Sequence, residues 1–256
     1  MQITDTHSHI YASEFDNDRE AMLRRAEAEG VKKVLMPAID STTHDDMIAV
    51  ENLNPGQCFS MMGLHPCSVK DNFREELSIV KKYFSEKKFV GVGEIGLDFY
   101  WDKTFITEQF DAFRLQINWA LDLNIPIVIH SRSSIDECIK VVREKQIGKL
   151  KGVFHCFSGT HEQANEIIGL GFYLGIGGVL TYKNSGLDKV IEQVDMKYIV
   201  LETDAPYLTP VPFRGKRNEV SYIKYVAQKL ADVKSITVGE VANITTANAE
   251  ALFGKL

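Results

Sequence analysis

The stretch IPIVIHSRSSIDECIKVVREKQIGKLKGVFH, residues 125–155, decides the fold class. It begins with a short apolar run at 125–130 and ends with another at 152–155, the lengths typical of buried strands. The segment between them is patterned as a helix. Ser134–Glu137 fits a capping box, and an apolar face then repeats with helical spacing at Ile135, Cys138, Ile139 and Val142. A strand, a helix and a second strand in this order predict a parallel sheet covered by helices.

The same alternation extends over the whole chain. Two further capping-box patterns stand at Thr160–Gln163 and Thr237–Glu240, and Gly30 and Gly171 occupy expected helix C-caps. Eight strand-like runs are present, at residues 2–9, 33–39, 57–65, 89–96, 125–130, 152–155, 172–177 and 198–204. We therefore expect an α/β fold, a (β/α)8 TIM barrel in which residues 1–256 form a single domain. An open nucleotide-binding sheet is the weaker interpretation, because no GxGxxG or GxxxxGK[ST] motif follows a strand.

Composition excludes several classes of protein. Apolar residues make up 45% of the chain and charged residues 25%, which excludes disorder. No apolar run approaches the ~18 residues of a membrane span, and the first strand-like run begins at Gln2, leaving no room for a signal peptide. The four cysteines form no CxxC pair, so we expect a cytoplasmic location. A net charge of −6 argues against nonspecific binding of nucleic acid over a broad surface, but it allows a local basic patch.

Titratable side chains gather where the predicted strands end. They are His7 and His9 on the first run, then His65, Glu94, His130, His155 and Asp204 on later ones. In a barrel the C-terminal ends of the strands carry the active site. His7 and His9 are two residues apart, so both side chains point to one face of the strand. If that face is the inner one, imidazoles and carboxylates converge at the mouth of the barrel.

Such a convergence predicts a site for divalent cations, because imidazole and carboxylate groups are a coherent ligand set. Glu94 lies in VGVGEIG, where small neighbours leave room, and one carboxylate can bridge two ions. Zinc, manganese, nickel and magnesium all stay open as the metal. His44 and His161 stand at expected helix starts, where we expect surface positions. The predicted ligands are His7, His9, Glu94, His130, His155 and Asp204.

Neighbouring residues have supporting roles in this prediction. We expect Asp5 and Glu202 to be hydrogen-bond partners rather than direct ligands. Asp98 is either a loop cap or another such partner. Cys156 follows His155 directly, so strand alternation predicts that its thiol turns away from the site into the core.

A basic segment follows the last predicted strand, DAPYLTPVPFRGKRNE at 204–219. Its Arg214, Lys216 and Arg217 suit capture of an anion such as phosphate, although a solvated loop is the alternative. Arg132 is a similar candidate with weaker support. His65 precedes a proline and either contacts substrate or shapes its loop. Aromatic residues on the same loops could stack on nucleobases or pack the loops: Phe99, Tyr100, Trp101 and Tyr207.

Seven motifs in order, from Asp5 to Glu219, resemble those of the TatD-type metal-dependent hydrolases, a branch of the amidohydrolase-like barrels. They are DTHSHI, GLHP, GEIGLDFY, PIVIHSR, HCFSG, ETDAPYLTP and PFRGKRNE. The resemblance implies a two-metal site that hydrolyses phosphodiester bonds in DNA. It implies one metal held by His7, His9, Glu94 and Asp204, and a second held by Glu94, His130 and His155. It also implies phosphate contacts from His65, Arg214 and Lys216.

The chain departs from the family pattern at a few positions. Ser133 and Ser134 replace a common Asp-Ala pair, Cys67 stands where histidine is frequent, and Val220 stands where proline is usual. None of these is a predicted ligand. The departures affect loop geometry and substrate preference rather than metal binding.

The predicted reaction is hydrolysis by metal-activated water, with Glu94 and Asp204 as the catalytic residues. No GxSxG nucleophile motif is present. DNA is the expected substrate, with no organic cofactor, and the protein is expected to be a monomer or a weak homo-oligomer. One alternative is a metal-dependent hydrolase of C–N or C–O bonds in a small molecule. The other is a non-catalytic metal-containing barrel that binds DNA.

Overall fold

A computed structural model describes residues 2–256 and shows a ring of parallel strands. Each of the eight predicted runs overlaps a strand, although most strands are shorter than the runs. Hydrogen bonding places them in chain order around the ring. The strands are β1 Ile3–Asp5, β2 Val31–Pro37, β3 Cys58–Met61, β4 Val92–Asp98, β5 Ile127–Arg132, β6 Gly152–Phe154, β7 Tyr173–Ile176 and β8 Ile199–Leu201.

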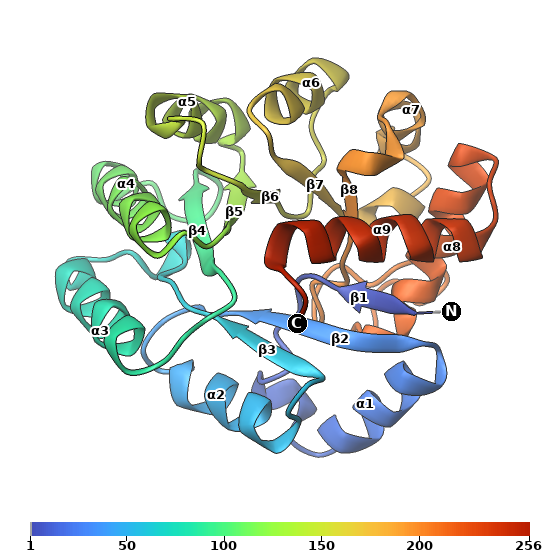
Figure 1. Ribbon diagram of the computed structural model, residues 1–256, viewed down its shortest axis with the longest axis horizontal. Coiled ribbons are helices and arrows are strands. Elements are labelled where there is room, and N and C mark those ends of the chain that lie inside the picture. Colours follow the sequence, from blue (N-terminus) through green and yellow to red (C-terminus); the bar gives the residue numbers. More distant parts are fainter. Residues whose placement is uncertain (1) are drawn as a thin grey trace.

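The ring is closed by contacts between two sheets. The first sheet contains β1 to β3 and the second contains β4 to β8. Met62 and Val92 form a parallel bridge that joins β3 to β4. On the other side, the amide of Thr6 donates to the carbonyl of Leu201 over 3.0 Å, which joins β1 to β8. The predicted TIM barrel is therefore confirmed, and Figure 1 shows the strands surrounded by helices.

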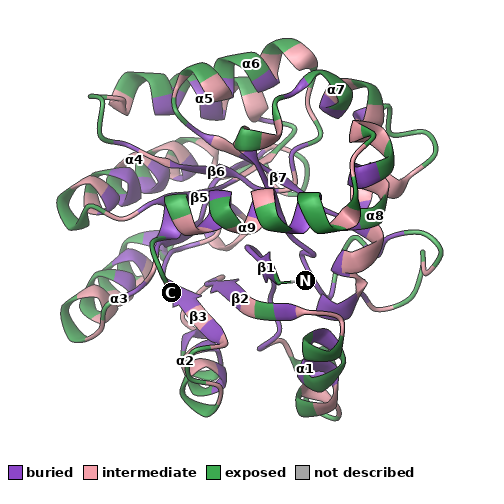
Figure 2. Ribbon diagram, turned by 45° about the vertical axis from the view of Figure 1, so that its right-hand side comes forward, coloured by how far each residue is buried: buried purple, intermediate pink, exposed green. Residues whose placement is uncertain are grey.

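Helices cover the outside of the ring. Their inward faces are buried and their outward faces are exposed (Figure 2), the pattern expected of amphipathic helices packed on a sheet. In the part of the chain that the structure describes, no helix is long and apolar enough to cross a membrane. The helices are α1 Arg19–Ala28, α2 His44–Leu53, α3 Phe73–Glu86, α4 Ile106–Leu123, α5 Ile135–Lys145, α6 His161–Gly169, α7 Leu187–Gln193, α8 Ile223–Lys234 and α9 Val238–Phe253.

Two of the three predicted capping boxes are confirmed. Thr160 and Thr237 each accept the backbone N–H three residues on, and the residue there bonds back to the cap. The prediction for Ser134 is wrong. Its hydroxyl donates to the carbonyl of Leu97 over 2.6 Å, so it ties α5 to β4 instead of capping the helix. Competition from a tertiary acceptor explains the difference.

The N-terminal end of the barrel is filled with apolar side chains. Helix α9 crosses this end (Figure 1), and its Ala249, Leu252 and Phe253 pack against the strands. Their partners come from five strands: Leu35, Met61, Val128, Val153 and Val200. The barrel is therefore closed at this end, and any site must lie at the other.

Glycines in β4 allow close strand packing. A Cβ at Gly93 would lie 2.7 Å from the Cβ of Val128, and one at Gly96 would lie 2.1 Å from the carbonyl oxygen of His130. The sequence suggested that small residues beside Glu94 leave room for metals. In the structure the glycines also let β4 approach β5 closely, which sets Glu94 beside His130.

Candidate metal centre

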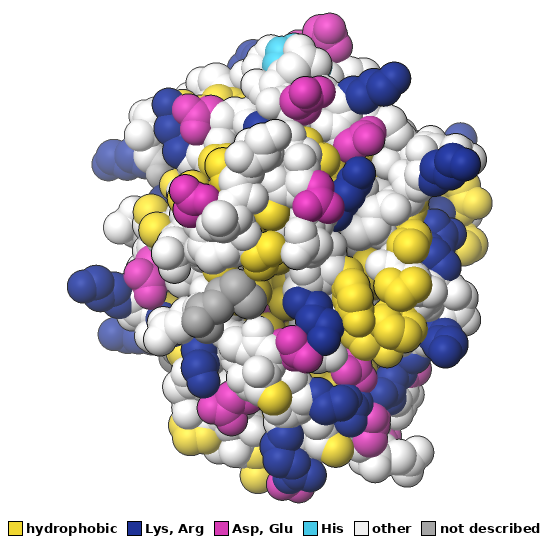
Figure 3. Space-filling model, turned by 90° about the vertical axis from the view of Figure 1, so that its right-hand side faces the viewer, with side chains coloured by type: hydrophobic (Ala, Val, Ile, Leu, Met, Phe, Trp, Pro, Cys, Tyr) yellow, Lys and Arg dark blue, Asp and Glu magenta, His cyan; other side chains and the backbone are white. Residues whose placement is uncertain are grey.

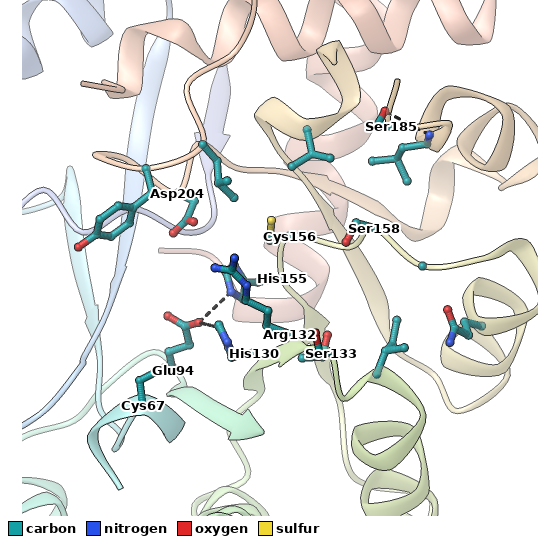
Figure 4. A pocket seen from close by; sticks show the side chains of 18 of the residues that line it. Cys67, Glu94, His130, Arg132, Ser133, His155, Cys156, Ser158, Ser185 and Asp204 are labelled. Carbon is teal, nitrogen blue, oxygen red and sulfur yellow. Dashed lines mark hydrogen bonds and ion pairs between the residues drawn. The ribbon is translucent and has the colours of Figure 1, made fainter. Parts of the chain in front are cut away.

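A cavity of about 1170 Å³ opens at the C-terminal ends of the strands. Figure 4 shows Glu94, His130, His155 and Asp204 on its wall. These residues come from four different strands or the loops directly after them. The expected position of the site at the C-terminal face is thus what the structure shows.

The β1 side of the cavity brings together two histidines and two carboxylates. His7 and His9 follow β1, and their Nε2 atoms lie 3.2 Å apart. Glu94 Oε2 is 3.2 Å from Nε2 of His7 and 3.4 Å from Nε2 of His9. Asp204 Oδ1 is 3.6 Å from both nitrogens. Two nitrogens and two oxygens therefore surround one point.

The opposite side of Glu94 faces a second pair of histidines. Its Oε1 lies 2.8 Å from Nδ1 of His130 and 2.8 Å from Nε2 of His155. The two oxygens of this one carboxylate thus face different pairs of imidazoles. That is the arrangement a carboxylate needs to bridge two cations.

Hydrogen bonds fix which nitrogen of two histidines carries a lone pair. The Tyr11 hydroxyl donates to the carbonyl of Pro37 over 2.6 Å, so Nδ1 of His9, 2.9 Å from that hydroxyl, must donate to it. Nε2 of His130 lies 2.8 Å from Asp98 Oδ2 and donates there. When these two rings are neutral, Nε2 of His9 and Nδ1 of His130 are therefore left with lone pairs that face Glu94.

These lone pairs test whether metal fits the site. A nitrogen lone pair that faces a carboxylate oxygen at 2.8–3.4 Å is unfavourable unless a proton or a cation lies between them. The cluster has such contacts on both sides of Glu94. Among the described residues, four triplets of ligand atoms lie mutually within 4.8 Å: His7–His9–Glu94, Glu94–His130–His155, His7–His155–Asp204 and His65–Cys67–His130. The residues present fit divalent cations on each side of Glu94.

The two carboxylates differ in proton affinity. Burial opposes ionisation of Glu94, but His155, His65 and His7 outweigh it and hold its pKa well below the usual range. Burial raises the pKa of Asp204 to about 6, against the opposing effect of His155 and His9. Glu94 therefore remains anionic near neutral pH, whereas Asp204 can exchange a proton there.

Supporting residues lie behind the cluster. Glu202 accepts the backbone N–H of Cys156 over 2.5 Å and lies 3.5 Å from Nδ1 of His155. Asp5 accepts the backbone N–H and hydroxyl of Thr203. Both act as hydrogen-bond partners, as expected. Asp98 accepts the backbone N–H of Tyr100 in its loop and also contacts His130. It therefore has both of its predicted roles, as a loop cap and as a hydrogen-bond partner of the site.

Tyr11 is the supporting residue that the sequence interpretation missed. Its ring is 2% exposed and its hydroxyl bonds His9. Its position two residues after His9 was the available signal, since it continues the alternation of His7 and His9.

His65 joins the cluster from the β3 side. Its Nε2 is 3.3 Å from Glu94 Oε1, and its Nδ1 accepts the backbone N–H of Cys67. It thus contacts the site and also shapes its own loop. Cys67, where the family commonly has histidine, lies on the cavity wall beside it.

The three basic residues of the segment after β8 lie outside the cavity wall. Arg214 stacks on Tyr182, with its Cζ 3.8 Å from the ring centroid. Lys216 lies 5.7 Å from the ring of Phe213, and Arg217 forms an ion pair with Asp18 on the outside of the barrel. None of the three basic residues lines the cavity.

Three smaller expectations are corrected. Cys156 lines the cavity because β6 ends at Phe154, and its positive φ of 47° breaks the alternation that would turn it away. His44 is fully buried and packs edge-on against Tyr83. His161 begins α6 as expected, but it lines the outer part of the cavity.

Comparison with known proteins agrees with this geometry. The sequence model of the family described as TatD related DNase matches residues 4–254. The chain belongs to the TatD-related DNase family. A Bacillus subtilis (strain 168) protein named "Uncharacterized metal-dependent hydrolase YabD" is 39% identical over 251 residues, which cover 97% of this chain and 98% of that protein.

Two further relatives of the TatD family extend the comparison. The crystal structure of YjjV, a TatD homologue from Escherichia coli K12, has a TM-score of 0.93 and 29% identity, covering 99% of this chain and 98% of that chain. A protein from Erwinia tasmaniensis named "3'-5' ssDNA/RNA exonuclease TatD" is 28% identical, covering 95% of this chain and 96% of that protein. This chain is thus a TatD-family metal-dependent hydrolase.

Proposed function

We propose that the protein hydrolyses phosphodiester bonds in DNA with two divalent cations. The observation that carries the proposal is the arrangement around Glu94. At the floor of an open cavity, one oxygen of this carboxylate faces His7 and His9, and the other faces His130 and His155 with His65 beside them. The name of the Erwinia relative supports a nucleic-acid substrate.

Each proposed metal ligand belongs to one of two cation sites, and Glu94 belongs to both. His7, His9, Glu94 and Asp204 would hold one cation, and Glu94, His130 and His155 would hold the other. Zinc, manganese, nickel and magnesium remain the candidate ions. Cations bound there would supply Lewis acidity that activates water and offsets charge on the phosphate.

The protein groups would then position and move protons. Asp204 Oδ1 faces the first pair of histidines, so with cations bound this carboxylate would be placed to accept a proton from the attacking water. Glu94 keeps its negative charge and would link the two cation sites. His65, beside Glu94 Oε1, contacts the phosphate.

Arg214 and Lys216 would meet a substrate only beyond the cavity. These two side chains do not line the cavity wall. They would therefore contact only the phosphates of a DNA strand that extends beyond the mouth of the cavity. Figure 3 shows a face of the protein on which basic and acidic side chains are interspersed rather than gathered by sign.

We also propose a setting for the reaction. Cys58, Cys67, Cys138 and Cys156 are free thiols, which suits the reducing cytoplasm. The enzyme would act there as a monomer or a weak homo-oligomer, without an organic cofactor.

The test is a metal add-back assay on DNA. Protein stripped with a chelator should lose DNA hydrolysis and regain it with one or more of the candidate ions. The Glu94→Gln protein, purified in parallel, serves as the control for contaminating nucleases and should stay inactive. Failure to bind any divalent metal would exclude the mechanism. Turnover of lactones or cyclic amides without turnover of DNA would favour the small-molecule alternative.

A further inference from the structure

Arg132 is the sole Lys or Arg side chain on the cavity wall within residues 2–256. It ends β5, two residues after His130, and Figure 4 shows it beside the labelled site residues. Its guanidinium makes no hydrogen bond or ion pair with the described residues. A solvent-accessible guanidinium without a carboxylate partner is free to bind an anion.

Two aromatic rings hold this guanidinium in place. Cζ of Arg132 lies 3.9 Å from the ring centroid of Tyr100 and 5.1 Å from that of Trp101. The two rings meet edge to face at 5.0 Å. Tyr100 is 56% exposed and Trp101 is 68% exposed, and Trp101 also lines the cavity. Rings this exposed contribute little to the core, so their open faces are available to a ligand.

We propose that Arg132, Tyr100 and Trp101 form a nucleotide subsite next to the metal centre, in which the guanidinium binds a phosphate and Trp101 stacks on an unpaired base. This inference rests on the proposed nuclease function and adds its specificity. A base offers its face for stacking only when it is not stacked in a duplex. A single-stranded substrate would offer such a base, in keeping with the name of the Erwinia relative.

The size of the cavity supports this assignment. At about 1170 Å³ it exceeds the ~300–1,000 Å³ of typical small-ligand pockets, so it has room for more than the reacting phosphate.

Arg214 provides an internal comparison. Like Arg132 it stacks on a tyrosine, at 3.8 Å from Tyr182, but it lies on the loop outside the cavity. We therefore expect Arg132 to contribute more to binding a short oligonucleotide than Arg214 does.

The experiment measures binding and catalysis separately. Binding of a fluorescent single-stranded oligonucleotide is followed by anisotropy in the Glu94→Gln background, where cleavage does not interfere. Adding Arg132→Ala or Trp101→Ala should weaken binding about tenfold each. In the active enzyme the same changes should raise KM for that oligonucleotide about tenfold, with a smaller effect on kcat.

The matched control is Arg74→Ala. Arg74 is an exposed arginine that stacks on Phe73 at 5.0 Å, and it does not line the cavity. Its removal should change neither Kd nor KM. Equal losses for Arg74→Ala and Arg132→Ala would show a general charge effect and overturn the subsite.

A substrate change tests the stacking contact. The penalty of Trp101→Ala should disappear on an oligonucleotide in which the flanking nucleotides lack their bases. A parent enzyme that cleaves DNA while both subsite variants keep normal Kd and KM would overturn the subsite but leave the nuclease function intact. A parent enzyme that neither binds nor cleaves DNA would overturn both.

Discussion

The two ends of the barrel are built from the same strands but differ in chemistry. At the N-terminal end, apolar side chains from five strands pack against α9. At the C-terminal end, the same ring presents imidazoles, carboxylates and one guanidinium to an open cavity. The N-terminal end is apolar and closely packed, and the C-terminal end is polar and accessible to solvent. Stability and chemistry are thereby separated along one axis of the molecule.

Non-glycine residues with positive φ are also distributed unevenly along the barrel axis. Of the six described non-glycine residues with positive φ, Asn124 and Ser235 end helices and the other four lie beyond strand ends at the mouth: Ser133, Cys156, Asp204 and Leu208. Such conformations cost of order 1–3 kcal/mol each and are retained where surrounding structure enforces them. Apolar packing at the N-terminal end can offset this conformational free energy. The loops at the mouth can therefore hold side chains in positions suited to binding.

The largest expected effect is on chemistry at the mouth. Glu94→Gln keeps the shape of the side chain but removes the charge that both pairs of histidines face. We expect turnover of DNA to fall about a thousandfold, equivalent to roughly 4 kcal/mol. Circular dichroism should show an intact fold. Retention of a tenth or more of the activity would contradict the bridging role.

The next effect concerns the closed end. Leu252 is 1% exposed between α9 and the strands, so Leu252→Ala should lower the free energy of unfolding by about 3 kcal/mol. Activity per folded molecule should not change, because the change is confined to the opposite end. Urea denaturation and an active-site titration measure the two quantities. Leu53→Ala, at a position 80% exposed, is the control and should leave stability unaltered.

A smaller change separates positioning from ligation at the mouth. Asp98→Asn keeps the oxygen that accepts the N–H groups of Tyr100 and Trp101, but it removes the carboxylate that orients His130. Metal affinity should fall about 10- to 100-fold, as measured by competition with a chelating dye. Asp102→Asn, which affects a surface ion pair with Lys70, is the control. An unaltered metal affinity would show that Asp98 has only a loop role.

The smallest effect is expected at the ion pair between Asp18 and Arg217 of the basic segment. Arg217 and Arg25 lower the pKa of the Asp18 carboxyl to about 2. Because this folded-state pKa lies below the unfolded value of 3.8, the ion pair stabilises the protein above about pH 4, and the contribution is lost as pH falls towards 2. Asp18→Asn should cost less than about 1 kcal/mol near neutral pH, since the pair is partly exposed. Urea denaturation should show the difference shrinking towards pH 3. A difference that grows on acidification would contradict the assignment.

Much of the architecture could be predicted from local patterns. The strand positions, the Thr160 and Thr237 caps and the turns at Gly30 and Gly171 depend on neighbouring residues, which the sequence displays directly. Ser134 was misjudged because its acceptor, Leu97, lies on another strand. Cys156 was misjudged because alternation ends with the strand, and the end of the strand is a tertiary outcome.

The sequence by itself determined the barrel and the set of candidate metal ligands, since periodicity and strand-end position are properties of the chain. Only the tertiary structure decided how those residues combine. It turned the two oxygens of Glu94 towards different pairs of histidines, placed Tyr11 and Asp98 behind them, and put Arg132 rather than Arg214 on the cavity wall. The reason is physical. Contacts over a few ångströms between distant segments depend on register and loop path, which no local pattern encodes.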